Sequence, residues 1–571
     1  MNMDPQNLTL SQLLHGRLFR IPEYQRPYSW QNQQRKELFD DLLTLHNKKQ
    51  DFHFMATVVG VNNGQRVLGT DEYQVVDIVD GQQRLTTLIL LLKAIALALA
   101  NDDPERQKLE SQLVKSDDST LALLQTNHDY SGFFIDYMRH GKRTTVTDFA
   151  SAADRNIVEG ITSAESFVAR WQRETREPLM TLLSSVKNRL RFIFHALDDE
   201  RMVYTVFEIL NTRGLPVAWL DRCKAVLMGI AFEEALNPPE MIRELHDIWQ
   251  RIYKQVGVRQ ALSSEALRFA ATLWSSDSLS KVCSDADALE VFRDAAIGNP
   301  NNTVAVSRFI EQVAGAVDEL LADTQKSAVT KIAHARLLAV AIELRFSGAE
   351  QQRLLKQWEH TSFRIFGLFR RDSRTGVGAY VRLARSIFGS DGSEPSYAEC
   401  MQAIKALAGS DSQFTAREGA EALCNTDCYD GWEESLRYFL YARERWLDEQ
   451  SGRLVASAQW NKIWAESASR TIEHILPQSP DTDSAWAELL RASGVKAESV
   501  CNRLGNLVLL PKPLNSQASN SDFSVKRKTY RQTGLAITDE IASHDSWGLE
   551  QIEARENELI EWAAEYWADV E

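Results

Sequence analysis

The sequence predicts a mostly helical α+β protein that consists of three successive parts. Apolar segments with the composition of strands gather in about the first 200 residues and again near residue 500, whereas the stretch between them has the apolar spacing of amphipathic helices. With 571 residues the chain is also too long for one ordinary domain. We therefore divide it into residues 1–236, a helical middle at 237–445, and residues 446–571.

Local charge is more informative here than total charge. The net charge of −15 argues against a uniformly basic surface for nucleic acid, but phosphate binding depends on local charge. Residues 364–385 hold six arginines against one aspartate, and residues 503–531 hold six basic residues against one acidic residue. These two segments are therefore candidates for contact with DNA.

The sequence indicates a cytoplasmic protein that does not enter a membrane. Residues 1–10 are polar and lack the pattern of a signal peptide. The longest apolar run, at 85–100, contains Lys93 and therefore indicates a buried helix rather than a membrane span. Six scattered cysteines do not form a disulfide framework, and reduced thiols are the simplest interpretation. Cys424 and Cys428 could share a helix face, which leaves a structural zinc open.

The first part contains a strand, a polar turn and a long helix in direct succession. The strand at 73–79 is apolar and β-branched, and the turn that follows reads Asp80-Gly81-Gln82-Gln83-Arg84. Because a helix N-terminus presents free N–H groups and a positive dipole end, such a turn can bind a phosphate. Arg84 can add a guanidinium group, and Asp80 could hold a metal or position a water. The same spacing also fits a capped helix with a surface arginine.

The other elements of the first part follow from proline, glycine and apolar patterns. Prolines at positions 22 and 27 favour an extended segment at 21–30. Asn211 and Arg213 follow a helical pattern at 201–210; alone they indicate helix caps, and near the Asp80 turn they would complete a phosphate site. The remaining predictions are helices at 8–14, 33–45 and 221–235, strands at 52–61 and 189–197, and a turn at 64–69.

The middle part predicts a series of amphipathic helices without a fixed-period repeat. The helical segments are 240–254, 263–274, 304–323, 333–344 and 351–370. We expect its arginine-rich segment to face DNA through Arg364, Arg370, Arg371, Arg374, Arg382 and Arg385.

The third part carries a second set of candidate residues. Glu473 and His474 lie side by side after an apolar turn, Asn506 opens an apolar strand-like run about 30 residues later, and Asn515 follows that run. Histidine titrates near neutral pH and can be the general base of phosphodiester hydrolysis. Glu473 and Asn515 supply the hard oxygen ligands that Mg²⁺ or Mn²⁺ requires. This order is typical of a ββα-metal (HNH, His-Me finger) nuclease, although a surface histidine and two turn asparagines would also produce it.

A basic helix is predicted at 521–531, just after these residues. Phe523 and Tyr530 are seven residues apart and can both face the core. Lys526 lies toward the same side, where we expect it to stabilise the charge of the transition state. Arg527 and Lys528 point away and are expected to bind the DNA backbone.

Two sets of motifs, far apart in the chain, resemble one family. The first set is Tyr24-Gln25-Arg26 within 21–30, the Asp80 turn, and residues 207–214; the second is Glu473-His474-Ile475-x-Pro477, Gly505-Asn506-Leu507 and Asn515. A chain with both sets resembles the GmrSD-type modification-dependent (type IV) restriction endonucleases. In such a chain a GmrS-like domain precedes a GmrD-like nuclease domain, and it is similar to SspE and BrxU proteins.

The resemblance implies a ParB/sulfiredoxin-like fold for the first part, which binds and hydrolyses a nucleoside triphosphate, GTP or ATP. It implies a nuclease directed at double-stranded, modified phage DNA. A homodimer is one oligomeric state that the sequence leaves open. Tyr24 and Gln25 would lie where the modification is sensed. The implied nucleotide-binding residues are Arg26, Asp80, Gly81, Gln82, Gln83, Arg84, Asn211 and Arg213.

Two other functions remain open from the sequence. The chain could be a ParB-like DNA-binding NTPase switch whose nuclease activity is secondary or nonspecific, such as that of a DNA nickase or an RNase. It could also be a toxin-like nuclease that acts on RNA, because a ββα-metal site does not select the sugar. The sequence names neither the DNA modification nor the preferred nucleotide.

Overall fold

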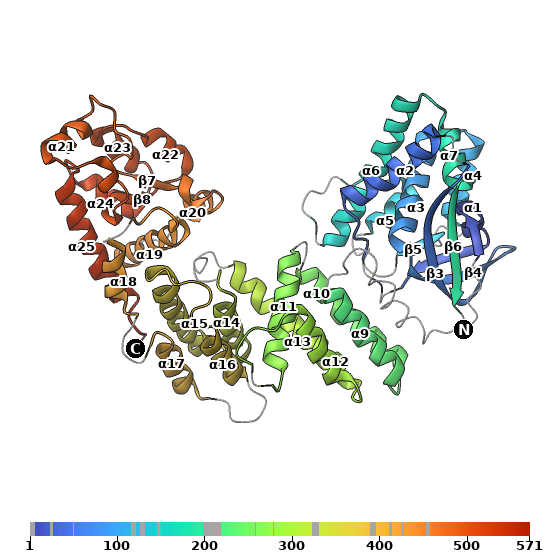
Figure 1. Ribbon diagram of the computed structural model, residues 1–571, viewed down its shortest axis with the longest axis horizontal. Helices are drawn as coiled ribbons and strands as arrows, with labels where there is room; N and C mark the ends of the chain where they lie inside the picture. Colours follow the sequence, from blue (N-terminus) through green and yellow to red (C-terminus); the bar gives the residue numbers. More distant parts are fainter. Residues whose placement is uncertain are drawn as a thin grey trace. The chain divides into compact units, whose positions relative to one another are not determined.

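The computed structural model folds into two compact units, Met1–Ala271 with Cys283–Ala314 (unit 1) and Thr272–Val282 with Gly315–Glu571 (unit 2). It is mostly helical, with a small mixed sheet in the first part of the chain, which confirms the predicted α+β class (Figure 1). The structure describes residues 6–22, 25, 27–48, 51–115, 121–125, 132–144, 149, 151–197, 219–256, 259–277, 279–322, 331–388, 395–409, 414–424, 427–452 and 457–570.

The sheet of unit 1 has six strands in the order β1-β6-β3-β4-β2-β5. Strand β3 pairs with β4 antiparallel and with β6 parallel, and β2 pairs parallel with both β4 and β5. The strands are β1 (Gln6–Thr9), β2 (Arg17–Ile21), β3 (His53–Leu68), β4 (Asp71–Asp80), β5 (Leu123–Gln125) and β6 (Leu190–Leu197).

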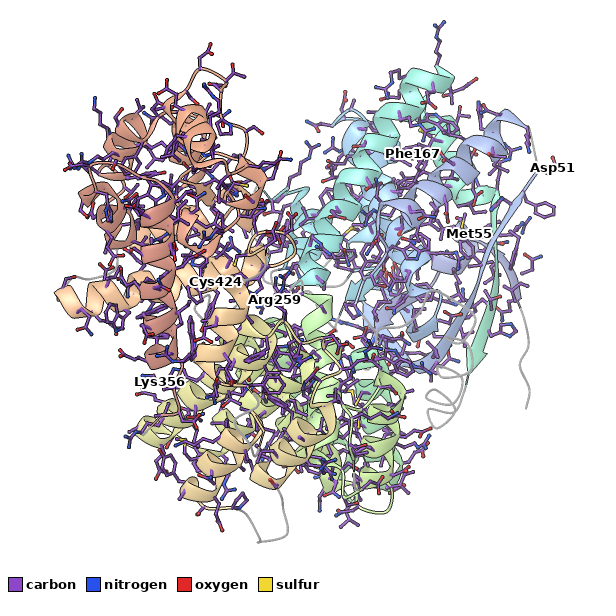
Figure 2. All side chains as sticks on the ribbon, turned by 60° about the vertical axis from the view of Figure 1, so that its left-hand side comes forward. Asp51, Met55, Phe167, Arg259, Lys356 and Cys424 are labelled. Carbon is purple, nitrogen blue, oxygen red and sulfur yellow. The ribbon has the colours of Figure 1, made fainter. Side chains whose placement is uncertain are left out.

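Helix α3 (Gln82–Ala98) forms the centre of the unit 1 core. Nearly all of its side chains are buried, including Lys93, whose ammonium lies 3.4 Å from Glu110 Oε1. It contacts α6 (Ala152–Thr175), on which Phe167, labelled in Figure 2, stacks against Phe39 with ring centroids 4.5 Å apart. An apolar helix in this position confirms the prediction that the run at 85–100 is a buried helix.

The predicted helices at 8–14, 33–45, 221–235, 240–254, 263–274 and 304–323 are present to within a few residues, whereas no helix was predicted at 152–175, 179–188 or 285–296. In chain order the other helices of the first part and of the helical middle are α1 (Leu10–Leu14), α2 (Asn32–Asn47), α4 (Pro104–Leu113), α5 (Phe133–His140), α7 (Leu179–Asn188), α9 (Trp219–Glu234), α10 (Pro238–Val256), α11 (Gln260–Trp274), α12 (Asp285–Ala296) and α13 (Asn301–Ala322).

The predicted turn at 64–69 is wrong, because β3 continues through it to Leu68. Gly64 has a φ of 81°, and the register of β3 against β4 shifts between Asn62 and Gln65. A bulge of this kind absorbs an extra residue without ending the strand. The chain reverses instead at Gly69, which has a φ of 64°.

Unit 2 ends in a short antiparallel ribbon surrounded by helices. Strand β7 (Ile472–His474) pairs with β8 (Leu507–Leu509), so that Glu473 lies opposite Val508 and His474 opposite Leu507. The helices are α14 (Ala333–Arg345), α15 (Gly348–Ser362), α16 (Val377–Phe388), α17 (Tyr397–Ala406), α18 (Ala416–Cys424), α19 (Glu433–Ser451), α20 (Ser457–Trp464), α21 (Ala485–Ser493), α22 (Lys512–Ala518), α23 (Phe523–Tyr530), α24 (Ala536–Ser543) and α25 (Leu549–Tyr566).

Helices that begin before residue 446 pack on the third part of the chain. Helix α19 contacts β8 and α24, and α18 contacts α25. A π-helix at Phe363–Leu368 follows α15, where a single longer helix at 351–370 was predicted. The division at residues 236 and 445 stays a prediction. Within the described part of the chain, no helix is both long enough and apolar enough to cross a bilayer.

Candidate functional site

The β7–β8 ribbon directs Glu473 and His474 to different surroundings. Successive residues of a strand point to opposite faces. Glu473 is 4% exposed, whereas His474 is only partly buried. The two residues that are adjacent in the sequence motif therefore have different partners.

His474 is held as a neutral imidazole. Its Nε2 lies 2.9 Å from Asn502 Oδ1, and its ring meets the ring of Tyr429 edge-on, with centroids 4.8 Å apart. Burial, with a smaller contribution from the charge of Lys526, lowers the pKa of His474 to about 4, while the hydrogen bond to Asn502 Oδ1 and the charge of Asp427 favour the charged form. A neutral imidazole at pH 7 can accept a proton, as a general base must.

Asn502 connects His474 to a carboxylate that sequence analysis did not identify. Asn502 Nδ2 donates to Asp427 Oδ2 over 2.8 Å. Burial alone would raise the pKa of Asp427, but hydrogen bonds from Asn502 and from the backbone of Asp430 and Tyr429 outweigh it, and the pKa lies below its ordinary value. Asn502 lies four residues before Asn506 in the sequence, and nothing in the sequence linked Asp427 to either.

Glu473 and Lys526 form a buried ion pair on the other face of the ribbon. Lys526 Nζ donates to Glu473 Oε1 and to the His474 carbonyl, each over 2.7 Å, and Tyr530 Oη donates to Glu473 Oε1 over 3.1 Å. Lys526 is 0% exposed. Burial raises the pKa of Glu473 and lowers the pKa of Lys526, and their mutual attraction opposes both shifts.

The helix α23 agrees with the predicted faces but not with the predicted contact of Lys526. Phe523 and Tyr530 are buried together with Lys526, as the heptad spacing indicated. The Lys526 ammonium, however, bonds to Glu473 inside the unit rather than lying at the surface. Arg527 donates to the Ala542 carbonyl and to Asp545, and Lys528 is exposed.

Asn506 and Asn515 bond to backbone groups around β7. Asn506 is 0% exposed; its Oδ1 accepts from Leu476 N, and its Nδ2 donates to the carbonyls of Leu476 and Cys501. Asn515 Nδ2 donates to the carbonyls of Arg470 and Ile472. Asn506 therefore fixes the loop after β7, and Asn515 ties α22 to the start of the same strand.

The predicted turn in unit 1 has the expected backbone. Gly81 has a φ of 91° and precedes α3, and a Cβ at this position would lie 3.0 Å from the Thr57 carbonyl oxygen. Only glycine fits such a left-handed, close-packed position. Asp80 Oδ1 accepts from Gly81 N over 2.7 Å. The N-cap residue of α3 is Gly81, which has no side chain to cap the helix, and this terminus lies at the turn.

The glutamines of this turn bond to the neighbouring segment of the chain. Gln83 Oε1 accepts from Ser29 N and Trp30 N, and its Nε2 donates to the Pro27 carbonyl. Gln82 Nε2 donates to Gln25 Oε1 over 3.0 Å.

Gln25 Nε2 in turn donates to the Val79 carbonyl, so these amides connect the segment 21–30 to the turn. Arg84 is exposed, with its guanidinium carbon 5.8 Å from the centre of the Trp30 ring. Tyr24, Arg26, Asn211 and Arg213, the other predicted residues of this region, lie outside the described residues.

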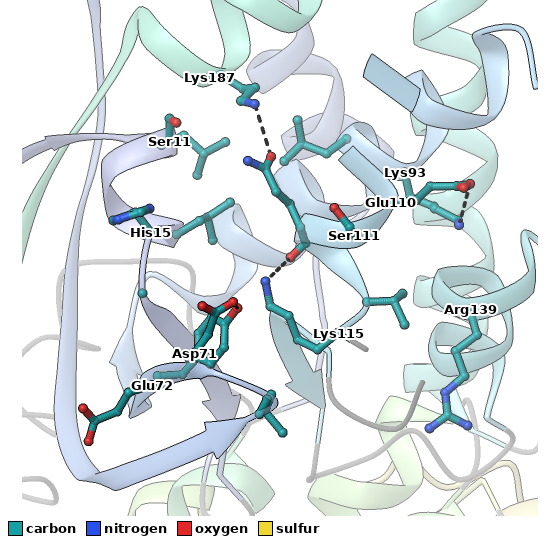
Figure 3. A pocket seen from close by; sticks show the side chains of 18 residues that line it. Ser11, His15, Asp71, Glu72, Lys93, Glu110, Ser111, Lys115, Arg139 and Lys187 are labelled. Atoms are coloured by element: carbon teal, nitrogen blue, oxygen red, sulfur yellow. Dashed lines mark hydrogen bonds and ion pairs between the residues drawn. The ribbon is translucent and has the colours of Figure 1, made fainter. Parts of the chain in front are cut away.

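A separate cavity of about 850 Å³ lies near the start of β4 (Figure 3). Asp71 and Tyr73 line it together with Lys115 and Lys187, and burial lowers the pKa of both lysines. Asp71 and Asp80 are the two ends of β4, about 30 Å apart along a strand of this length. No residue of the Asp80–Arg84 turn lines the cavity, so it is distinct from the predicted nucleotide site.

Of the six arginines predicted to face DNA, Arg364 is buried, whereas Arg370, Arg371, Arg374 and Arg382 are exposed. Arg364 is 7% exposed and bonds to Asp569 over 2.7 Å, so its expected contact with DNA is wrong. The others with hydrogen bonds are Arg370, which donates to the carbonyls of Asp427 and Asp430, Arg374, which bonds to Asp372, and Arg385, which donates to the Ser275 carbonyl.

The described residues give no ready-made metal cluster. No group of three or more histidine, cysteine, aspartate or glutamate side chains among them is arranged to hold a metal ion. The six cysteines are all free, and Cys428 Sγ donates to the Leu423 carbonyl.

Comparison with known families covers both candidate sites. The model of the N-terminal domain of the GmrSD restriction endonuclease matches residues 10–228, and the model of the C-terminal domain of GmrSD restriction endonucleases matches residues 415–562. No match was found among the curated proteins. The chain has both domains in one polypeptide, with the Asp80 turn in the first match and His474 in the second. It belongs to the GmrSD family and is a type IV restriction endonuclease that acts on DNA.

Proposed function

We propose that this protein is a metal-dependent nuclease of the ββα-metal (HNH) type, regulated by a nucleoside triphosphate and directed at modified phage DNA. The observation that supports the nuclease chemistry best is His474, a neutral histidine on an antiparallel ribbon with α23 packed behind it. In this role His474 accepts the proton of the water that attacks the phosphodiester.

Two side chains near β7 carry oxygens of the type that a hard divalent cation prefers, and one of them, Glu473, is paired with Lys526. Asn515 uses its Nδ2 on two backbone carbonyls, and no described residue donates to its Oδ1. Glu473 Oε1 accepts from Lys526 Nζ and from Tyr530 Oη. These two residues would hold Mg²⁺ or Mn²⁺, with water and phosphate oxygens as the remaining ligands, as is usual for Mg²⁺. A bound cation would neutralise charge on the phosphate and the leaving oxygen.

The nucleotide site is proposed at the Asp80–Arg84 turn, with a ParB/sulfiredoxin-like fold around it. The N-terminus of α3 directs backbone N–H groups toward the turn, where a phosphate could accept from them, and the exposed Arg84 offers a guanidinium. The buried Gln82 and Gln83 support this turn through their bonds to Gln25 and to residues 27–30. In this proposal GTP or ATP binds here, and Tyr24 and Gln25 lie on the segment that senses the modification.

Digestion of matched nucleic acids tests the nuclease half of the proposal. Duplex DNA with and without phage base modifications, phosphorothioate DNA and RNA are incubated with the full chain and Mg²⁺ or Mn²⁺, with EDTA as the metal-free control. We expect metal-dependent cutting of one class of modified DNA, slowed by on the order of 10²-fold or more in His474→Ala. His544→Ala is the matched control, because His544 is exposed and contacts Trp547. Preferential cutting of RNA would contradict the proposal.

Hydrolysis of GTP and ATP tests the other half. Asp80→Ala and Arg84→Ala are each expected to abolish hydrolysis while the circular dichroism spectrum stays unchanged. Hydrolysis at the parent rate in both variants would show that the turn is only a helix start.

A further inference from the structure

We propose that Asp427 and Asn502 are positioning residues that hold His474 in one tautomer, with the proton on Nε2 and the lone pair on Nδ1. This inference rests on the proposed role of His474 as general base. It assigns the basic atom of the site and two residues that act on it through hydrogen bonds.

The first step is the orientation of the Asn502 amide. The Asp427 carboxylate has no hydrogen to donate, so each of its contacts is an acceptance. Its Oδ1 accepts from Tyr429 N over 2.8 Å and from Asp430 N over 3.0 Å, and its Oδ2 accepts from Asn502 Nδ2 over 2.8 Å. Asn502 must therefore turn its NH₂ group toward Asp427.

The second step is the tautomer of the histidine. With its NH₂ on Asp427, Asn502 presents Oδ1 to His474 Nε2 at 2.9 Å, and Gln478 Nε2 approaches the same oxygen at 3.3 Å. An amide oxygen only accepts, so His474 Nε2 carries the proton. In a neutral imidazole the other nitrogen then has the lone pair. No hydrogen bond to Nδ1 is formed by any residue that the structure describes.

The hydrogen-bonded series Asp427–Asn502–His474 is called the relay below. The backbone around this relay is held by other contacts. Cys428 N donates to the Asn502 carbonyl over 3.2 Å, which joins the two loops beside the side-chain contact. Arg370 donates to the carbonyls of Asp427 and Asp430 over 3.2 and 2.9 Å. The Asp427 side chain can therefore be changed while the main-chain links between the loops remain.

The substitution Asp427→Asn reverses the relay without changing its shape. The new oxygen stays on Tyr429 N and Asp430 N, so the new NH₂ faces Asn502. The Asn502 amide then turns, its NH₂ meets His474 Nε2, and the proton moves to Nδ1. We expect single-turnover cleavage to slow by about 10- to 100-fold, within the range of general-base catalysis, with the Kd for DNA unchanged. Asp430→Asn is the matched control, since it removes the same charge from the same turn; it should cut at the parent rate.

The exchange Asp427→Asn/Asn502→Asp tests the direction of the hydrogen bonds. In the double variant a carboxylate at position 502 accepts from both neighbours, so His474 again has its proton on Nε2. We expect the cleavage rate of the double variant to lie within about threefold of the parent rate, as a restored general base predicts. In Asn502→Asp alone the new carboxylate faces the carboxylate of Asp427, and cleavage should be slower than in the parent. Imidazole ¹⁵N shifts, assigned to His474 with His474→Gln, should show Nε2–H in the parent and double variant and Nδ1–H in Asp427→Asn.

The outcomes separate this inference from the function on which it rests. Parent-rate cutting by Asp427→Asn, with His474→Ala inactive, overturns the relay and leaves the nuclease proposal intact. Equal losses in Asp427→Asn and Asp430→Asn, or a double variant that is folded but as slow as the single variants, also overturn the relay. Parent-rate cutting by His474→Ala overturns the nuclease proposal itself.

Discussion

The two candidate sites use carboxamide side chains in different ways. At the turn of unit 1, Gln82 and Gln83 bond to the neighbouring chain segment and hold it in place. On the ribbon of unit 2, Asn506 does the same for the loop after β7, but Asn502 bonds to the imidazole of His474. One polar sequence motif can therefore contain both residues that stabilise the backbone around a site and residues that contact its reactive side chain. Only the hydrogen-bond partners in the structure distinguish these two roles.

The largest effect on stability is expected at Lys526, which stabilises the fold through its buried ion pair with Glu473. Lys526→Met should lower the free energy of unfolding by about 3–5 kcal/mol, because it leaves the Glu473 carboxylate buried without its ammonium. Lys528→Met, on the exposed face of the same helix, should change it by less than about 0.5 kcal/mol. Urea unfolding of the full chain, followed by tryptophan fluorescence, measures both. If both variants changed the free energy of unfolding equally, the ion pair of Lys526 would not stabilise the fold more than the exposed Lys528 does.

The next largest effect is expected at Gln83. Gln83→Ala leaves the N–H groups of Ser29 and Trp30 and the carbonyl of Pro27 without this partner, at a cost of about 3 kcal/mol. Gln33→Ala is the control, since its amide bonds to Glu37 at the surface. The same unfolding measurement applies. A loss of nucleotide hydrolysis in a Gln83→Ala variant of parent stability would instead make Gln83 a residue that contacts the nucleotide.

Arg84 should show the opposite pattern. Arg84→Ala removes an exposed side chain that contacts Trp30, so the free energy of unfolding should change by less than about 0.5 kcal/mol. Nucleotide binding, measured by calorimetry, should nevertheless be lost. If the variant were destabilised but still bound nucleotide, Arg84 would be a residue that stabilises the turn rather than one that binds the nucleotide.

The smallest effect concerns Lys528 and the DNA backbone. If the exposed ammonium neutralises one phosphate, Lys528→Ala should make the slope of log K against log salt shallower by about 0.9 on duplex DNA. Fluorescence anisotropy at several salt concentrations measures the slope. An unchanged slope would show that Lys528 only adds charge to the surface.

Local patterns predicted much of the fold. The apolar strand at 73–79, the glycine after it and the long helix are all present, because each depends on neighbours in the sequence. The short strands β1, β2 and β5 were missed, since three to five residues carry little periodic signal and their pairing partners are distant. The turn at 64–69 was wrong because a glycine there is also compatible with a bulge.

The candidate nuclease site was also predicted only in part, because local sequence patterns do not reveal contacts between distant residues. The spacing on α23 correctly placed Lys526 beside Phe523 and Tyr530, but a helical period does not reveal the charge that Lys526 meets across the core. Asp427 lies 75 residues before Asn502, and their contact exists only in the folded chain. The catalytic roles of His474 and the other site residues stay predictions.

The central claim is that one chain carries two separate chemistries, nucleotide hydrolysis at the Asp80 turn and DNA cleavage at His474. Its most direct test measures both activities in the same preparations of the parent, His474→Ala and Asp80→Ala. We expect His474→Ala to lose cleavage by on the order of 10²-fold or more and to hydrolyse nucleotide at the parent rate, while Asp80→Ala loses hydrolysis. Parent-level cleavage by His474→Ala, or loss of both activities in that variant, would contradict the account.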